Sequence, residues 1–522
     1  MSEFIRAIDG FGLSRPEAVA FSNSRGERMT FGELKERSDA IAAHLAQLDP
    51  ERKPVVVYGH KSPLMIACFL ACAKSGRAYV PTDVIYPDLR IADIIGQLDS
   101  PIVLNTSDRD ISAISDAMGP CLGAAELAAC APEPAELLPE SACLTGDETF
   151  YILFTSGSTG HPKGVEVSAE SVDNFWKWML ERFSPDRTGA PESEQRTLFG
   201  RAPFSFDVSL GDMAMSIGAG DAMYALVEED EDNLSRAFDA LATSGAHAWS
   251  STPTFAEMCL RDPSFSPELL PNLSTFILAG EALKGETVIK LLDRFPGSQV
   301  INAYGPTEST DLVSTATITR EMAETQNPLP IGYAKTGTDL YVLDPETLEP
   351  MPNGEKGELF IVGNTVAKGY FGRPDLTEAA FGVCPDSLAK GRRSYRTGDA
   401  AIMADDGCVY YYGRLDFQVK LHGFRIELGE IEAALCRLDG VMSACVLPVE
   451  RRGTLSHLAG YVVSRKAPEA EGASNLERVQ AVKDGLRAFL PEYMIPRKIV
   501  FIDEMPLGAS GKVDRKRLQE LG

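Results

Sequence analysis

The chain has 522 residues, too many for one simple hydrophobic core, which predicts a large compound domain joined to a smaller one. Hydrophobic residues make up 44% of it and charged residues 24%, proportions that are ordinary for a globular enzyme. The net charge of -25 argues against nucleic acid or an anionic membrane as a partner, because both attract basic proteins. An anionic ligand would therefore need local binding groups and a metal ion.

Neither a targeting segment nor a membrane helix is indicated. The opening residues Met1 to Phe4 lack a signal pattern, and no uninterrupted apolar stretch approaches the roughly 20 residues of a membrane helix. We therefore expect a cytoplasmic protein with no stable membrane insertion. The 10 cysteines are scattered without a C-x-x-C pair and there are 6 histidines, so neither a disulfide framework nor a zinc site is expected.

Up to about Tyr412, helix-like stretches alternate with short apolar runs, which predicts a layered α/β lobe over residues 1–412. Helices are expected at 30–45 and 63–74, and strands at 54–58, 101–105, 275–278 and 299–301. Residues 332–412 change character, because the apolar runs at 340–343, 358–362 and 408–412 are separated by glycine and proline turns. This segment is predicted to be a β-rich subdomain of the large lobe.

Residues 413–522 are predicted to form a small, mobile α+β lobe of their own. A helix is expected at 430–436, strands at 444–449 and 457–463, and a second helix at 476–490. The chain then closes with a glycine-containing loop.

A loop rich in hydroxyl groups and glycine follows the apolar run that starts at Tyr151. Glycines allow the backbone N–H groups to turn inward, hydroxyls add donors, and a lysine supplies positive charge, so the loop is suited to phosphate. It lacks the G-x-x-x-x-G-K-[ST] spacing of a Walker A loop. A flexible linker is the alternative. The loop residues concerned are Thr155, Ser156, Gly157, Ser158, Thr159, Gly160, Lys163 and Gly164.

The same loop resembles the signature of the adenylate-forming (ANL) superfamily, which activates carboxylates with ATP. Segments 73–83, 206–209, 302–308, 357–363, 395–399, 413–420, 490–496 and 511–515 resemble motifs of its amino-acid-adenylating branch, in the expected order. Within that branch the resemblance is nearest to stand-alone D-alanine:D-alanyl carrier protein ligases, as in segments 57–60, 202–207, 251–259 and 415–423.

The resemblance implies a site for ATP and Mg2+. Lys512, Glu308 and Lys163 would be catalytic, with Glu308 as the magnesium ligand and Lys512 bridging the substrate carboxylate and the α-phosphate. Tyr304 would stack on adenine, although a core tyrosine is equally expected from the residues alone. The remaining implied ATP contacts are Thr155, Ser156, Gly157, Ser158, Thr159, Gly160, Asn302, Ala303, Gly305, Pro306, Thr307, Asp399 and Arg414.

Several of these residues have simpler alternative roles. Asp399 beside a glycine could cap a turn, Arg414 could be a solvated surface arginine, and Lys512 near the chain end would normally face solvent. Relatives usually carry asparagine where this chain has Ser510, a residue that still suits a tight turn.

The resemblance also implies an amino acid as substrate. Asp207 would bind its α-ammonium group, and the alternative for Asp207 is a helix N-cap. Other implied substrate contacts are Val208, Ala279, Gly305, Asp311 and Lys512. The small lobe is expected to rotate about Asp416, which could otherwise be a simple turn aspartate, to remove Lys512 and open a thiol channel.

The implied function is activation of D-alanine as D-alanyl-AMP and transfer to the phosphopantetheine thiol of a carrier protein, for D-alanylation of lipoteichoic or teichoic acid. The carrier is expected to act in trans, because the chain contains no Gly-Gly-x-Ser carrier motif. The alternatives are an adenylation enzyme for another small polar or basic amino acid in nonribosomal peptide-type synthesis, an acyl-CoA ligase, or a non-catalytic binding module.

Two residues depart from the D-alanine pattern. Relatives carry cysteine at the position of Ala279 and a small apolar residue at the position of Asp311. Because an unpaired carboxylate facing the pocket would cost several kcal/mol, we expect Asp311 to turn outward to solvent, and D-alanine remains the first expectation. If Asp311 faces the pocket, a small polar or basic amino acid such as serine or a diamino acid is the alternative.

Overall fold

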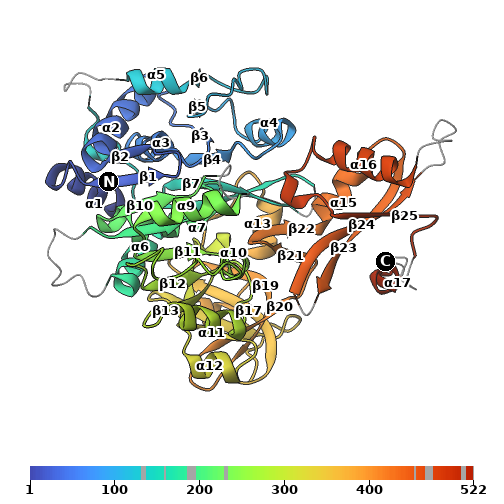
Figure 1. Cartoon of the computed structure of the whole chain (residues 1–522). Coiled ribbons are helices and arrows are strands. Elements are labelled where there is room, and N and C mark those ends of the chain that lie inside the picture. Colours follow the sequence, from blue (N-terminus) through green and yellow to red (C-terminus); the bar gives the residue numbers. More distant parts are fainter. Residues whose placement is uncertain are drawn as a thin grey trace.

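The computed structural model describes residues 1–130, 137–157, 160–184, 195–227, 233–451, 454–464, 474–506 and 513–520. Figure 1 shows a large lobe that carries the N-terminus and a smaller lobe, at the red end of the colour scale, that carries the C-terminus. The two lobes meet along one side. The predicted α/β class with a small α+β lobe is confirmed.

One sheet of the large lobe has seven strands in the order β18-β8-β7-β4-β3-β5-β6. Strands β3 and β4 are buried at every position, as is typical of parallel strands that are covered on both faces. The bounds are β3 (Val55–Gly59), β4 (Tyr79–Asp83), β5 (Val103–Asn105), β6 (Cys121–Leu122), β7 (Thr149–Thr155), β8 (Lys163–Ser168) and β18 (Gly369–Tyr370).

The second sheet has thirteen strands in the order β16-β17-β19-β20-β15-β14-β13-β12-β11-β9-β10-β1-β2. The predicted β-rich segment is an antiparallel extension of this sheet, joined to the parallel part through β14 and β15. The bounds are β1 (Val19–Asn23), β2 (Arg28–Thr30), β9 (Thr197–Gly200), β10 (Ala222–Ala225), β11 (Ala248–Ser251), β12 (Thr275–Leu278), β13 (Gln299–Tyr304), β14 (Ser314–Thr317), β15 (Pro330–Ala334), β16 (Thr338–Leu343), β17 (Lys356–Gly363), β19 (Ser394–Met403) and β20 (Val409–Arg414).

The helices of the large lobe begin at local capping signals. Thr30 and Glu33 form a capping box at α2, and Ser62 caps α3, whose first residue is Pro63. The bounds are α1 (Glu3–Ser14), α2 (Phe31–Leu48), α3 (Pro63–Lys74), α4 (Asp88–Gly96), α5 (Ala124–Ala129), η2 (Glu140–Ala142), α6 (Ala169–Phe183), α7 (Val208–Met215), η4 (Ile217–Ala219), α9 (Leu234–Ser244), α10 (Pro253–Cys259), α11 (Gly285–Arg294), η5 (Thr307–Ser309), α12 (Arg320–Thr325), α13 (Pro374–Ala380) and α14 (Asp386–Ala389).

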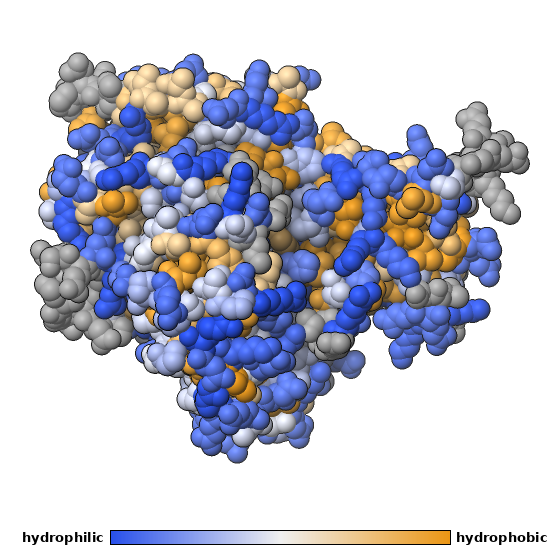
Figure 2. Space-filling view, viewed as in Figure 1, coloured by the Kyte–Doolittle hydropathy of each residue, from blue (hydrophilic) through white to orange (hydrophobic). Residues whose placement is uncertain are grey.

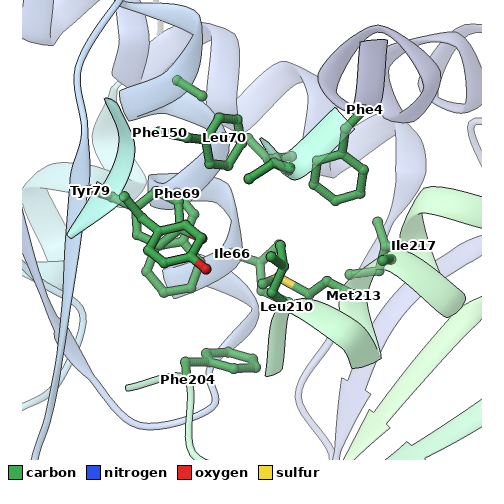
Figure 3. Packing of buried hydrophobic residues seen from close by; sticks show 14 of the residues in the cluster. Phe4, Ile66, Phe69, Leu70, Tyr79, Phe150, Phe204, Leu210, Met213 and Ile217 are labelled. Atoms are coloured by element: carbon green, nitrogen blue, oxygen red, sulfur yellow. The ribbon is translucent and has the colours of Figure 1, made fainter. Parts of the chain in front are cut away.

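The main core lies where α1, α3 and α7 pack against the strands. Figure 3 shows Phe69 of α3 beside Tyr79 of β4, and their rings stack with centroids 4.3 Å apart. Helix α3 is buried continuously from Met65 to Lys74, so it is enclosed on all sides rather than along one stripe. This packing fixes α7, whose first residue Val208 lines the site.

The small lobe contains a two-stranded hairpin and a three-stranded sheet covered by α15 and α16. Figure 2 shows a concentration of hydrophobic residues on the surface of this lobe. Its exposed large apolar side chains include Phe417, Met442 and Leu476. The bounds are β21 (Gln418–Leu421), β22 (Phe424–Glu427), α15 (Leu428–Cys436), β23 (Val441–Arg451), β24 (Thr454–Ser464), α16 (Asn475–Leu486), η7 (Glu492–Met494), β25 (Lys498–Ile502) and α17 (Arg515–Glu520).

In the part of the chain that the structure describes, no helix combines the length and the apolar character that crossing a membrane would demand.

Candidate functional site

A central cavity of about 90 Å³ lies between the two lobes. The large lobe contributes the ends of β7, β12 and β13 and the start of α7, as expected for a ligand site beyond the carboxyl ends of parallel strands. Eleven predicted site residues line it together: Thr155, Ser156, Asp207, Val208, Ala279, Gly305, Pro306, Thr307, Asp311, Asp399 and Arg414.

A larger neighbouring cavity of about 420 Å³ is lined by Asn302, Ala303 and Tyr304. It shares Gly305 and Arg414 with the central cavity, so the two spaces adjoin. The Tyr304 hydroxyl donates to Asp399 Oδ2 at 2.5 Å, and Arg414 Nη1 donates to Asp399 Oδ1 at 3.0 Å. Burial raises the pKa of Tyr304 well above its usual value, so its hydroxyl stays a neutral donor.

Of the two roles considered for Tyr304, the structure shows the core tyrosine. It is only 6% exposed and packs in the core with Val313 and Val409, yet one side of it lines the larger cavity. Stacking on adenine stays a prediction.

The predicted metal ligand Glu308 is fully buried and paired with side chains. Its Oε2 accepts from Arg425 Nη1 at 2.6 Å, its Oε1 accepts from the Tyr370 hydroxyl at 2.7 Å, and Lys163 Nζ lies 3.7 Å away. Burial raises the pKa of the Glu308 carboxyl, but Arg425 and Lys163 outweigh burial and hold this pKa well below its usual range. In this lobe arrangement Glu308 is already neutralised by protein cations.

The described part of the predicted phosphate-binding loop contacts the small lobe. Ser156 Oγ donates to the Arg425 carbonyl at 3.0 Å, and the Gly157 N–H donates to Glu430 Oε2 at 3.2 Å. A Cβ on Gly160 would lie 2.8 Å from that of Ala433 in α15, so only glycine permits this approach. Ser158, Thr159 and Lys512 lie outside the described residues.

The small lobe and the region of α4 bring further residues to the site that the motifs of the sequence do not indicate. The β21–β22 hairpin places Gln418, Lys420, Gly423 and Arg425 on the central cavity, which Tyr86, Arg90 and Tyr493 also line. Arg90 Nη1 lies 2.5 Å from Glu430 Oε1, and both side chains are 3% exposed. Two cations, Lys420 and Arg425, in an otherwise partly apolar hairpin were the available signal.

Asp207 is bonded by two donors of the large lobe. The Thr307 hydroxyl donates to Oδ2 at 2.6 Å and the Val208 N–H donates to Oδ1 at 2.9 Å, so the predicted helix-capping alternative is also present. Burial raises the pKa of the Asp207 carboxyl, while the Thr307 bond opposes that rise. Asp207 faces the central cavity as a positioned acceptor.

The expectation that Asp311 turns outward to solvent is wrong. Asp311 is 2% exposed, lines the central cavity, and its Oδ2 has no hydrogen-bond partner. Burial, Asp207 and Asp212 together raise the pKa of the Asp311 carboxyl well above its usual value. The reason is local: Thr310 and Asp311 both have left-handed backbone angles, with φ of 60° and 66°, which direct the chain into the lobe after η5.

Asp416 has turn contacts. It lies two residues beyond the end of β20 and pairs with Arg414. Its Oδ1 accepts from the Gln418 N–H at 3.0 Å. Its predicted role as a hinge stays a prediction.

A third, mainly apolar cavity of about 60 Å³ adjoins the central one on another side. The two cavities share Phe206, Val208, Ala279, Gly280 and Gly423, and Thr252 and His422 extend the third cavity away from the centre. The central cavity is therefore flanked by a large space of mixed polar and apolar lining and by a small, mainly apolar one.

Among the residues that the structure describes, no group of three or more histidine, cysteine, aspartate or glutamate side chains is placed to hold a metal ion. A cation at Glu308 would therefore need ligands from a bound molecule or water as well.

We expect the buried carboxyl of Asp212 to make the stability of the protein depend on pH. Burial raises its pKa to about 7, opposed by Ser250 and Lys61. At a pH between the pKa of Asp212 in the unfolded chain and its pKa in the folded chain, only the folded chain keeps the proton. The contribution of Asp212 to stability therefore falls as pH rises and levels off above pH 7. A rise of the Asp212 pKa from 3.8 to about 7 corresponds to roughly 4 kcal/mol in the free energy of unfolding.

Asp212→Asn should remove this dependence. We expect the difference in Tm between the variant and the wild type to become more positive from pH 5 to pH 8, measured by thermal unfolding. An unchanged difference across that range would show that Asp212 is ionised in the folded chain.

Comparison with known proteins agrees with this geometry. Residues 12–371 match the family model described as AMP-binding enzyme, and residues 430–512 match the model described as AMP-binding enzyme C-terminal domain. The chain is 37% identical to the D-alanine--D-alanyl carrier protein ligase of Bacillus licheniformis, covering 99% of both chains. It is 36% identical to the D-alanine--D-alanyl carrier protein ligase of Listeria welshimeri, again with 99% of each covered.

The fold resembles that of holo-PA1221, an NRPS protein containing adenylation and PCP domains. The TM-score is 0.79 at 24% identity, and the match covers 99% of this chain and 84% of that one.

Proposed function

The chain belongs to the AMP-binding enzyme family, and on this premise we propose that it activates D-alanine with ATP as D-alanyl-AMP and transfers the D-alanyl group to the phosphopantetheine thiol of a separate carrier protein. The carrier would serve D-alanylation of teichoic acid. Two relatives matched over 99% of their length, each named a D-alanine--D-alanyl carrier protein ligase, support this substrate and this partner.

The observation that carries the proposal is the order of the three cavities. The central cavity, with Asp207 and Thr307 on its wall, suits a small amino acid whose ammonium group pairs with Asp207. The large cavity beside Tyr304 and Asp399 suits the nucleotide, and the narrow apolar cavity suits a thiol on a flexible arm. Such an arrangement serves two successive reactions of one acyl group.

In the first step a carboxylate oxygen of the amino acid bonds to the α-phosphorus of ATP and the bond to pyrophosphate breaks. Because both reactants are anions, the site has to neutralise charge. Lys163 and Lys512 supply positive charge for this step, and the loop of Thr155, Ser156 and Gly157 binds the leaving phosphates through hydroxyl and N–H donors.

Glu308 would hold Mg2+ through a carboxylate oxygen, and the metal would supply positive charge that offsets the charge of the phosphates. Glu308 can take that role only after Arg425 has withdrawn, because the guanidinium lies 2.6 Å from Oε2 in the arrangement described. Binding of the metal therefore belongs to a different orientation of the small lobe.

The arrangement described here suits the second step. Gly423 and Phe424 border the apolar cavity, and Phe424 stacks on Tyr493 with ring centroids 3.9 Å apart. The Gly423 N–H also donates to Glu281 of the large lobe at 2.8 Å. The thiol sulfur would attack the acyl carbonyl carbon along this cavity, and AMP would leave.

An ATP–pyrophosphate exchange panel over D- and L-amino acids tests the proposal. D-alanine should exceed L-alanine in kcat/KM, and the activated group should pass to a phosphopantetheinylated carrier faster than to coenzyme A. Release to coenzyme A alone would favour an acyl-CoA ligase instead. Exchange that proceeds without any amino acid would reject the activity.

Asp207→Asn should raise the amino-acid KM about 10- to 100-fold, because a charge-assisted hydrogen bond contributes about 1.5 to 3 kcal/mol. The KM for ATP should stay nearly unchanged, since the lost contact is with the ammonium group alone. Steady-state exchange measures both constants, and Asp108→Asn at an exposed position is the control. A comparable rise in both KM values would place Asp207 in the fold or the nucleotide site.

A further inference from the structure

The buried carboxyl of Asp311 is the feature of the central cavity that D-alanine does not use. Its Oδ2 has no hydrogen-bond partner, and the side chain is 2% exposed. An unsatisfied buried carboxyl is costly, so a structure that keeps one at a ligand cavity points to a partner that comes with the ligand.

The surrounding chain is shaped to keep that carboxyl inside. Thr310 and Asp311 hold consecutive left-handed backbone angles, which are strained for the β-branched Thr310 and tolerated by an aspartate. Opposite them, a Cβ on Gly211 of α7 would lie only 2.4 Å from Asp311 Oδ2. The absence of a side chain at Gly211 therefore leaves the space in which the carboxyl lies.

Two carboxylates, Asp207 and Asp212, raise the pKa of the Asp311 carboxyl and so oppose its ionisation. Cations also line this cavity, but none of them bonds to Asp311 Oδ2. Asp207 already has a role toward an α-ammonium group, with Thr307 and Val208 bonded to its oxygens. A ligand with a second cationic group would offset the cost of ionising the buried Asp311 carboxyl, because the two opposite charges would stabilise each other.

We propose that the central cavity accepts, in addition to D-alanine, a short diamino acid of the 2,3-diaminopropionate class, with Asp311 bound to its side-chain ammonium group. The proposal rests on the proposed function. Activation follows the same chemistry, in which a carboxylate oxygen bonds to the α-phosphorus and pyrophosphate leaves. A volume of about 90 Å³ limits the side chain to a few heavy atoms. Asp311 then determines the choice between a methyl group and an aminomethyl group.

The test compares pyrophosphate exchange with D-alanine and with 2,3-diaminopropionate in the wild type, Asp311→Asn and Asp311→Gly. Asparagine keeps the shape and tolerates the left-handed backbone, and glycine adopts it freely, whereas a β-branched residue would be strained there. We expect Asp311→Asn to lower kcat/KM for diaminopropionate about 10- to 100-fold relative to that for D-alanine. Asp311→Gly should do the same.

Thermal stabilisation of each variant by ATP with either amino acid gives a second readout that does not depend on turnover. Diaminopropionate should raise the Tm of the wild type more than that of Asp311→Asn, while D-alanine raises both alike. A wild type that exchanges with D-alanine but not with diaminopropionate overturns this inference alone, as does a ratio of the two substrates that Asp311→Asn lowers less than tenfold. A wild type that no amino acid activates overturns the proposed function instead.

Discussion

Replacing Lys512 by alanine is expected to abolish formation of the aminoacyl adenylate and to leave transfer from a supplied adenylate to the carrier largely intact. A cation that meets developing charge only in the transition state of one step contributes about 3 to 4 kcal/mol, so exchange should fall at least about 100-fold. The neighbouring residues support a role confined to another lobe orientation. Val513 and Leu518 pack against the small lobe's own sheet, and Figure 1 shows α17 on the side of that lobe away from the large lobe.

Pyrophosphate exchange measures the first half-reaction, and single-turnover transfer from synthetic D-alanyl-AMP measures the second. Lys516→Ala removes an exposed lysine of α17 and should change neither. Equal losses in both half-reactions would reject the assignment of Lys512 to adenylation.

Arg90→Met should have the opposite effect, slowing transfer to the carrier about 100-fold or more while exchange is retained. The variant leaves Glu430 buried at 3% exposure without its guanidinium partner, and breaking such a pair costs about 3 to 5 kcal/mol. This cost falls on the lobe arrangement in which α4 meets α15. Adenylation, which we assign to a different arrangement, does not bear it.

The double variant Arg90→Met, Glu430→Met removes both charges and should recover part of the transfer rate. Arg109→Ala, which breaks the exposed pair with Asp88, serves as the control and should cost no more than about 1 kcal/mol. If Arg90→Met lowers exchange as much as transfer, the pair supports the fold rather than one orientation.

Local signals predicted much of the fold. The helix expected at 63–74 and the strand expected at 275–278 match α3 and β12, because a serine cap before proline and a short apolar run decide these elements locally. The helix expected at 476–490 ends earlier, at Leu486, and residues 487–490 form a turn before Pro491. The order of strands in the two sheets depends on distant pairings that no local pattern encodes.

The residues of the candidate site could be named from motifs, but their partners could not. Arg90 and Glu430 are separated by 340 positions, and their contact exists only because two lobes meet. The Asp311 side chain lies inside because of the backbone angles of one turn. The cost of burying an unpaired carboxylate predicted that it would face solvent, and that prediction is wrong. The sequence therefore predicts which residues belong to the candidate site, whereas the pairing of their charges can be determined only from the three-dimensional structure.

Glu308 presents one carboxylate to two rival partners, and this has a thermodynamic consequence. Arg425 reaches Oε2 only when the hairpin is seated in the site, so any cation that binds the same oxygen competes with that seating. By linkage, each tenfold gain in the concentration of such a competitor above its dissociation constant disfavours the seated hairpin by about 1.4 kcal/mol. The equilibrium between lobe orientations therefore depends on the cations in solution as well as on the chain. Divalent ions should shift it away from the seated hairpin even when no amino acid is present.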